Sequence, residues 1–142
     1  MGFKMSTYIG TKTIRAITMT KGAYNLLRGW ELSRNDDAAE VGYLVEYTDG
    51  GKPNVEGFKG YVSWSPKDVF ERSYKVADSF IDRLKIERDE HKDKLEKLSD
   101  FHNSAAWESI SSSQKDLLIV QLGHMTGYEA VLSMRLLDLE GY

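Results

Sequence analysis

Tyr61-Val62-Ser63-Trp64-Ser65-Pro66-Lys67-Asp68 is the stretch in which the chain changes from one pattern of secondary structure to another. Before Ser65, apolar and polar residues alternate, as in strands with one buried face. At Ser65 the pattern becomes that of a helix start. The serine hydroxyl can accept an early helical amide, proline is tolerated at the first helical position, and Asp68 places an acid in the first turn. We therefore predict that a helix begins here.

Outward from this point toward the N-terminus, period-two alternation marks three segments. These are Thr13–Met19, Gly42–Tyr47 and Phe58–Trp64. Thr48-Asp49-Gly50-Gly51 is a turn signal because glycine accepts positive φ, so the last two strands should form a hairpin. Between the first two strands, Lys21–Leu27 predicts a short helix that ends at Gly29.

Toward the C-terminus, the pattern predicts two long helices. Apolar residues recur at three- and four-residue steps at Phe70, Tyr74, Ala77, Ile81, Leu84, Leu95 and Leu98. Asp82–Lys97 carries six acidic and six basic side chains, which are typical of a solvated helix face. Ser99–Ser113 breaks the pattern, with a short turn around Trp107, and a second helix follows over Gln114–Leu139. The predicted fold is α+β: a small antiparallel β-sheet lobe over residues 1–65, followed by a long antiparallel helical hairpin over residues 66–142.

The second helix carries two columns of different chemistry. Leucine and methionine recur every seven residues at Leu118, Met125, Leu132 and Leu139, flanked by Leu122 and Leu136, which predicts a core seam. Beside it lie Gln121, Tyr128 and Arg135, also seven residues apart. This second column is either an edge whose side chains reach water, or a polar and aromatic row that faces a cavity between subunits and holds a nucleotide.

The composition excludes several classes of protein. The 142 residues suffice for one domain, or for one small lobe with a helical arm, and there are no cysteines, so disulfides and thiolate metal sites are excluded. We expect a cytosolic protein, because no segment resembles a membrane span or a secretion signal. The net charge of −3 disfavours general DNA binding, although a small anionic ligand needs only a few local cations.

The sequence does not predict an enzyme. His91, His102 and His124 lack metal-site spacing, and there is neither a Gly-rich phosphate loop nor a Gly-x-Ser-x-Gly elbow. Carboxylates are plentiful but fall mostly on predicted solvated faces. We expect no catalytic residues, no metal and no cofactor.

The candidate ligand-binding residues combine aromatic rings with arginines. A ring offers a stacking surface for a base, and a guanidinium matches phosphate oxygens. In the lobe, Arg28 and Trp30 lie in an Arg-Gly-Trp motif, and Trp64 precedes the predicted helix start. In a lobe this small, tryptophans such as Trp30 and Trp64 are more often core residues than stacking surfaces for a ligand. Tyr74, Phe80 and Arg83 lie along the first long helix, and its apolar stripe passes through Arg88 and His91.

Several of these motifs resemble known families. The lobe resembles a small protein family of tailed phages. The similar segments are Tyr8-Ile9-Gly10-Thr11-Lys12, Met19-Thr20, Tyr24-Asn25 with Arg28-Gly29-Trp30, Gly42-Tyr43-Leu44-Val45-Glu46-Tyr47, and Tyr61 through Phe70. Leu95–Phe101 and Gln114–Arg135 are similar to a hairpin domain of phage anti-defence sponge proteins. The combination resembles the Thoeris anti-defence family of the first type described. The resemblance covers nearly the whole chain, but His91-Lys92 and His102-Asn103 depart from the family pattern.

The resemblance implies a bacteriophage protein that acts without turnover in the host bacterial cytoplasm. It would sequester glycocyclic ADP-ribose, the signal made by TIR-domain enzymes, and so silence Thoeris immunity. Relatives with the hairpin alone bind cyclic di- and trinucleotides of CBASS immunity, so these are a second ligand class. The resemblance also implies a homo-oligomer, a dimer or a hexamer formed as a trimer of dimers. Arg28, Tyr74, Phe80 and Arg83 would line the primary pocket, with Gln121 and Arg135 contributed by the partner chain.

Two other functions remain open from the residues alone. In one, the chain is a non-catalytic oligomerisation module that docks a host protein and binds no nucleotide. In the other, it is an enzyme that degrades the signal. A sponge returns its ligand intact after denaturation, whereas an enzyme returns products.

Overall fold

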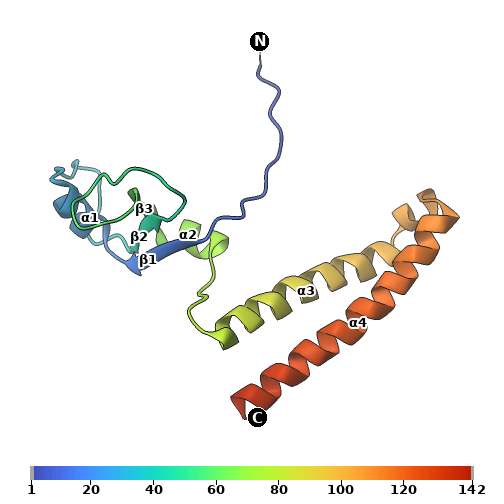
Figure 1. The fold of residues 1–142 in the computed structure, drawn as a ribbon. Coiled ribbons are helices and arrows are strands. Elements are labelled where there is room, and N and C mark those ends of the chain that lie inside the picture. Colours follow the sequence, from blue (N-terminus) through green and yellow to red (C-terminus); the bar gives the residue numbers. More distant parts are fainter. Residues whose placement is uncertain (1, 142) are drawn as a thin grey trace. The chain divides into compact units, whose positions relative to one another are not determined.

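The computed structural model describes residues 2–141. The chain divides into two compact units, Met1–Tyr74 and Lys75–Tyr142. The elements follow in the order β1 (Ile14–Thr18), α1 (Lys21–Arg28), β2 (Gly42–Tyr47), β3 (Val62–Pro66), α2 (Lys67–Ser73), α3 (Phe80–His102), η1 (Ala105–Ser109) and α4 (Ser112–Glu140) (Figure 1). The protein is therefore α+β, with an antiparallel sheet followed by long helices, as the sequence predicts.

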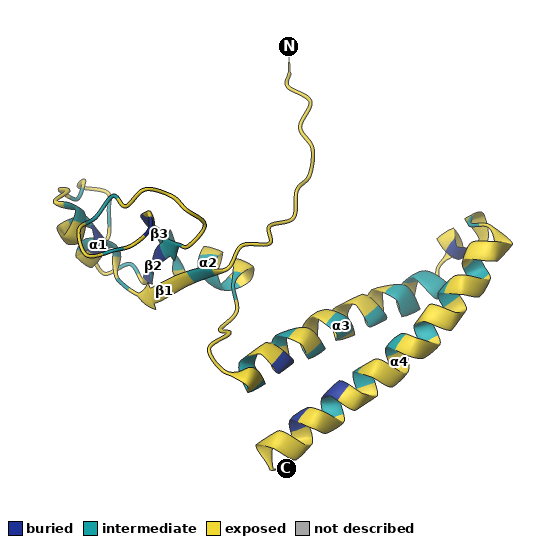
Figure 2. Cartoon of the chain, viewed as in Figure 1, coloured by how far each residue is buried: buried dark blue, intermediate teal, exposed yellow. Residues whose placement is uncertain are grey.

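The first unit is built on a three-stranded sheet in the order β1-β2-β3. Both pairs of neighbours are antiparallel, with Ala16 opposite Val45 and Val45 opposite Ser63. Short helix α1 packs against the sheet through Tyr24, which forms a buried cluster with Leu44 and Val62. Gly29 ends α1 in the left-handed conformation at φ 70°, which confirms the sequence prediction. This cluster is the core of the unit (Figure 2).

The switch from strand to helix differs from the sequence prediction. Ser65 and Pro66 belong to β3, where Pro66 lies opposite Gly42, and the helix begins only at Lys67. Proline fits here because β3 is an edge strand of this sheet, where a missing amide N–H breaks no ladder. Pro66 is the N-cap of α2 and supplies no side-chain cap, so Ser65 does not act as the predicted cap.

The predicted first long helix is divided in two. Helix α2 ends at Ser73 and α3 begins at Phe80. A capping box at Ser79 explains the restart, because its hydroxyl accepts from the Asp82 amide at 3.0 Å while the Asp82 carboxylate accepts from the Ser79 amide at 3.2 Å. Tyr74 and Ala77 therefore lie outside the helix that was predicted to contain them.

The second unit is an antiparallel helical hairpin of α3 and α4 joined through η1. Leu84, Leu132 and Leu136 form its buried cluster, with Ile81 packed against it. Trp107 of η1 is also buried and lies edge-on to Phe101, closing the turn of the hairpin. Leu139, predicted in the seam, is exposed instead. Among the helices of residues 2–141, none has the length and hydropathy that a bilayer span requires.

Candidate functional site

Two of the predicted binding residues meet in the first unit, at the end of α1. The guanidinium carbon of Arg28 lies 4.2 Å from the ring centre of Trp30, and Arg28 Nη1 donates to the Tyr24 hydroxyl at 2.8 Å. Tyr24 and Trp30 are edge-to-face at 5.9 Å. Because Tyr24 is buried in the core, it fixes the position of Arg28. Trp30 is 52% exposed and Arg28 is half-buried, so the ring of Trp30 is partly open to solvent beside this cation.

Trp64 has a different environment, although it was predicted alongside Trp30. Its Nε1 donates to the Met19 carbonyl at 2.7 Å, and its ring packs against the buried cluster of Tyr24, Leu44 and Val62. A Cβ placed on Gly42 would lie 2.4 Å from this ring. Trp64 is thus packed tightly onto the sheet, which agrees with the alternative interpretation of this residue as part of the core.

Tyr74 lies in an aromatic stack at the end of the first unit. Its ring is 5.0 Å from that of Phe70, which in turn stacks on Tyr43 at 4.0 Å. The Tyr43 hydroxyl donates to Glu71 at 3.2 Å, and burial together with this carboxylate raises the pKa of Tyr43. The predicted grouping of Tyr74 with Phe80 and Arg83 on one helix does not occur, because the chain leaves the helix between them.

The second unit brings together Phe80 and Arg135, from opposite ends of the hairpin sequence. The guanidinium carbon of Arg135 lies 5.7 Å from the Phe80 ring centre, and Phe80 is 54% exposed. Arg83 is one helical turn from Phe80, and its Nη1 donates to the Ala77 carbonyl at 3.2 Å. The first turn of α3 and the last turns of α4 therefore present two guanidinium groups, those of Arg83 and Arg135, and the half-exposed aromatic ring of Phe80.

The predicted polar column continues from Arg135 along α4. The Tyr128 hydroxyl donates to Glu87 of α3, and its ring meets His91 edge-on at 4.6 Å. The hydrogen bond to Glu87 and partial burial raise the pKa of Tyr128, against a smaller opposing effect of Arg135. Gln121, further toward the hairpin turn, has its amide 3.6 Å from the Met125 sulfur. The column therefore runs beside α3.

Sequence reasoning did not pair Tyr128 with Glu87 or His91, which lie on the other helix. Nδ1 of His91 is buried and has no hydrogen-bond partner within residues 2–141. The only sequence signal was the interruption of the apolar stripe of α3 by Arg88 and His91. Arg88 itself pairs with the neighbouring Asp89 at 2.9 Å.

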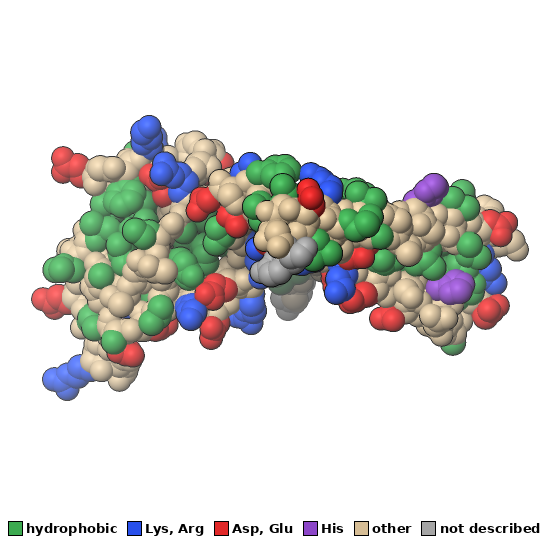
Figure 3. Space-filling model, turned by 90° about the horizontal axis from the view of Figure 1, so that it is seen from below, with side chains coloured by type: hydrophobic (Ala, Val, Ile, Leu, Met, Phe, Trp, Pro, Cys, Tyr) green, Lys and Arg blue, Asp and Glu red, His purple; other side chains and the backbone are tan. Residues whose placement is uncertain are grey.

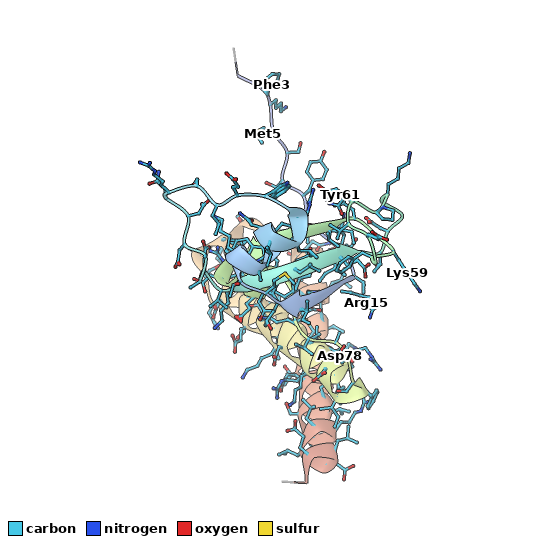
Figure 4. The ribbon with its side chains drawn as sticks, turned by 90° about the vertical axis from the view of Figure 1, so that its left-hand side faces the viewer. Phe3, Met5, Arg15, Lys59, Tyr61 and Asp78 are labelled. Atoms are coloured by element: carbon cyan, nitrogen blue, oxygen red, sulfur yellow. The ribbon has the colours of Figure 1, made fainter. Side chains whose placement is uncertain are left out.

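A shallow pocket in the first unit was also not predicted. Its volume is about 320 Å³, and it is lined by residues that include Arg15, Glu46, Phe58 and Lys59. Figure 4 shows Arg15 and Lys59 on the same side of the sheet. The Glu46 carboxylate accepts hydrogen bonds from the backbone amides of Lys59 and Gly60, at 3.0 and 3.3 Å. Nothing about these residues in the sequence distinguished them from ordinary surface positions.

Within the described part of the chain, no group of three or more histidine and carboxylate side chains could hold a metal ion.

Residues 78–138 match the model of a protein family described as Sequestin. The matched segment spans α3, η1 and nearly all of α4, and is less than half of the chain. No curated protein and no solved structure matches the chain. The match thus lies on the helical hairpin and includes Phe80, Arg83, Gln121 and Arg135.

Proposed function

We propose that the protein captures a cyclic ADP-ribose-type signalling nucleotide and holds it without converting it. The observation that carries the proposal is that the segment similar to the Sequestin family contains Arg135 over the exposed ring of Phe80. The family's name denotes sequestration, and the side chains suit the ligand. A ring can stack on a base, and the guanidinium groups of Arg135 and Arg83 can bind pyrophosphate oxygens.

The specific ligand that we propose is glycocyclic ADP-ribose, the product of TIR-domain enzymes in Thoeris immunity. The protein would then be a bacteriophage anti-defence factor that acts in the host bacterial cytoplasm, where this signal is made. Arg28 and Trp30 of the first unit provide a second ring and cation pair for the same chemistry. Cyclic di- and trinucleotides of CBASS immunity are the second ligand class in this proposal.

The mechanism is mass action. A sponge must keep the free signal below the threshold of its effector, and nanomolar binding corresponds to about −12 kcal/mol. Such affinity for a small ligand requires that most of its surface be buried. No bond in the nucleotide is made or broken, so inhibition of the effector should depend on the ratio of protein to signal and not on time.

Calorimetric titration of the full chain with glycocyclic ADP-ribose tests the assignment of residues. Phe80→Ala and Arg28→Ala should each weaken binding at least tenfold and leave the circular dichroism spectrum unchanged. Val76→Ala and Arg34→Ala are matched controls, because both residues are exposed and outside the two ring and cation pairs. Unchanged affinity in both test variants would show that the pocket lies elsewhere.

A release experiment separates the three possible functions. The protein is mixed with glycocyclic ADP-ribose, separated from free ligand, and denatured by heat. Intact nucleotide in the supernatant supports sequestration. Altered products would indicate an enzyme, and the absence of any captured nucleotide, with cyclic di- and trinucleotides tested in parallel, would leave a docking module as the better interpretation.

A further inference from the structure

Strand β1 forms one edge of the sheet, and within residues 2–141 no strand pairs with its outer side. The amide of Met19 donates to the Gly42 carbonyl at 2.9 Å, and hydrogen-bonded and non-hydrogen-bonded pairs alternate along an antiparallel ladder. Ile17 therefore bonds to β2, whereas the N–H and C=O groups of Ala16 and Thr18 point away from the sheet. Because β1 is largely exposed, this edge can accept another strand.

The shallow pocket of the first unit adjoins this edge on one face of the sheet. Ile17 lies opposite Leu44 in the register, so their side chains share a face, and Phe58 packs against the same buried cluster as Leu44. All three residues line the pocket, and Ile17 is 60% exposed. Figure 3 shows further hydrophobic side chains on the surface of the first unit, at the left of the view. The pocket is thus partly apolar and lies next to an open strand edge.

Two cations of this pocket form no ion pair within the part of the chain that the structure describes. These are Arg15 of β1 and Lys59, both exposed, which lie on the same side of the sheet (Figure 4). Glu46 is the one acidic residue among those lining the pocket, and its carboxylate already accepts from the backbone amides of Lys59 and Gly60. The pocket therefore suits a ligand that carries a negative charge.

We propose that this edge binds an extended acidic segment of another protein, which joins the sheet as a fourth strand beside β1. Such an addition gains affinity from backbone hydrogen bonds and specificity from alternate side chains. The residue opposite Ala16 exchanges both hydrogen bonds with it. In an antiparallel arrangement, the preceding residue lies opposite Ile17 and the following one opposite Arg15, with Cβ atoms about 4.5 to 5.5 Å apart. The segment therefore has an apolar residue and, two positions later, Asp or Glu.

The chain's own segments fit this edge less well. Residues 2–12 are exposed and outside any helix or strand, and they include Lys4 and Lys12 but no acidic residue. They would add positive charge to a pocket that already has two unpaired cations. Pairing of β1 with the β1 strand of a second copy would bring Arg15 and Lys59 of both copies together without an acidic group to neutralise them. Charge complementarity thus favours an acidic segment of a different protein.

Fluorescence anisotropy of a labelled peptide tests the recognition in the full-length chain. The probe is a nine-residue peptide of threonines, with valine at the fourth position and glutamate at the sixth. We expect saturable binding to the wild type and roughly tenfold weaker binding to Arg15→Glu, because the reversed charge repels the glutamate. Arg34→Glu is the matched control, since Arg34 is an exposed cation of the same unit that does not line the pocket.

A charge swap completes this experiment. A peptide with lysine in place of the glutamate should bind Arg15→Glu more tightly than it binds the wild type. Absence of binding of the acidic peptide to the wild type, or equal binding to the wild type and Arg15→Glu, would overturn the proposal.

Methylation of the peptide backbone tests the strand pairing itself. The residue between valine and glutamate donates its N–H to β1, so an N-methyl group on that residue should abolish binding. An N-methyl group on the glutamate is the control, because that N–H points away from β1, and it should leave the affinity unchanged. Equal losses for the two peptides, or no loss for either, would mean that the peptide does not bind as a strand.

Amide hydrogen exchange establishes whether the edge is open in the free protein. We expect fast exchange at Ala16 and Thr18, slow exchange at Ile17, and slower exchange at the first two when the peptide is bound. Slow exchange of all three amides without peptide would mean that a second copy or residues 2–12 already cover the edge, which contradicts the proposal. These experiments use no nucleotide, and the pocket lies outside the segment that matches the Sequestin family, so their outcome is independent of the proposed function.

Discussion

Replacing Leu132 with alanine removes three carbon atoms from the most enclosed position between α3 and α4, where Leu132 is 1% exposed. Transfer of these carbons to water costs about 2.4 kcal/mol, at about 0.8 kcal/mol for each. The cavity that remains adds to the cost, and such substitutions span about 2.7 to 5 kcal/mol. The neighbouring cluster holds only Leu84, Leu136 and Ile81 and can partly close, so we expect the hairpin to lose about 3 kcal/mol in free energy of unfolding.

Urea denaturation followed by circular dichroism at 222 nm measures this loss, because most helical residues belong to the hairpin. Val131→Ala is the matched control. Val131 is the adjacent residue and is half exposed, so its truncation should cost about 1 kcal/mol or less. A loss below 1 kcal/mol for Leu132→Ala, or equal losses for both variants, would refute the assignment of Leu132 to the buried core of the hairpin.

Three further predictions concern local features. Gly42→Ala should destabilise the first unit by about 2 kcal/mol or more, measured by tryptophan fluorescence during denaturation, because its Cβ would overlap the Trp64 ring; a neutral effect would contradict this packing. The pKa of Tyr128 is raised chiefly by its hydrogen bond to Glu87, so this contribution to stability is present below the ordinary phenol value of about 10 and is lost as the pH rises through the folded value. In Glu87→Gln, ultraviolet titration should show the pKa of Tyr128 closer to that ordinary value, and an unchanged titration curve would contradict the assignment. Ser79→Ala should cost about 1 kcal/mol and speed amide exchange in the first turn of α3, whereas unchanged exchange would rule out the capping box.

Much of the architecture could be predicted from local patterns. Period-two alternation located β1 and β2, the Gly29 signal ended α1 correctly, and α4 begins and ends within two residues of its predicted bounds. The third strand was predicted over Phe58–Trp64 but begins only at Val62, so that prediction is right only in part. These features depend on the conformational preferences of residues that are close together in the sequence, so local patterns suffice to predict them. The predicted division of the chain at residue 65 is based on the change of sequence pattern and stays a prediction. The two compact units are defined by contacts between residues, and on that criterion the boundary falls between Tyr74 and Lys75.

The errors have identifiable causes. Ser65-Pro66 has the residues of a helix start, but strand pairing with β2 takes precedence and extends β3 through Pro66. The true start signal, Ser79 followed three residues later by Asp82, was present but was hidden by an apolar stripe that appeared continuous across the break. Leu139 was placed in the seam by strict seven-residue steps. Leu139 comes one heptad after Leu132, which is 1% exposed, but it lies in the last turn of α4 and is 45% exposed.

The candidate site was less predictable than the fold because its contacts join distant residues. Glu87 and Tyr128 are 41 positions apart, and their meeting depends on the register of two helices across the turn at η1. Arg135 and Phe80 depend on the same register. The sequence identified suitable residue types on each helix, but only the packed hairpin shows which of them face each other.

The energetics of the proposed capture show what the exposed site of a single chain would have to gain on binding. A cation and ring pair at an exposed position contributes about 0.5 to 1 kcal/mol, and Phe80 is half exposed in a single chain. One such pair and a few charge-assisted hydrogen bonds in water fall well short of the roughly 12 kcal/mol that nanomolar capture requires. The same groups are worth more when water is excluded, because a lower effective dielectric strengthens each charge interaction. Nanomolar capture would therefore require that the ring of Phe80 and the guanidinium group of Arg135 be shielded from water when the ligand is bound.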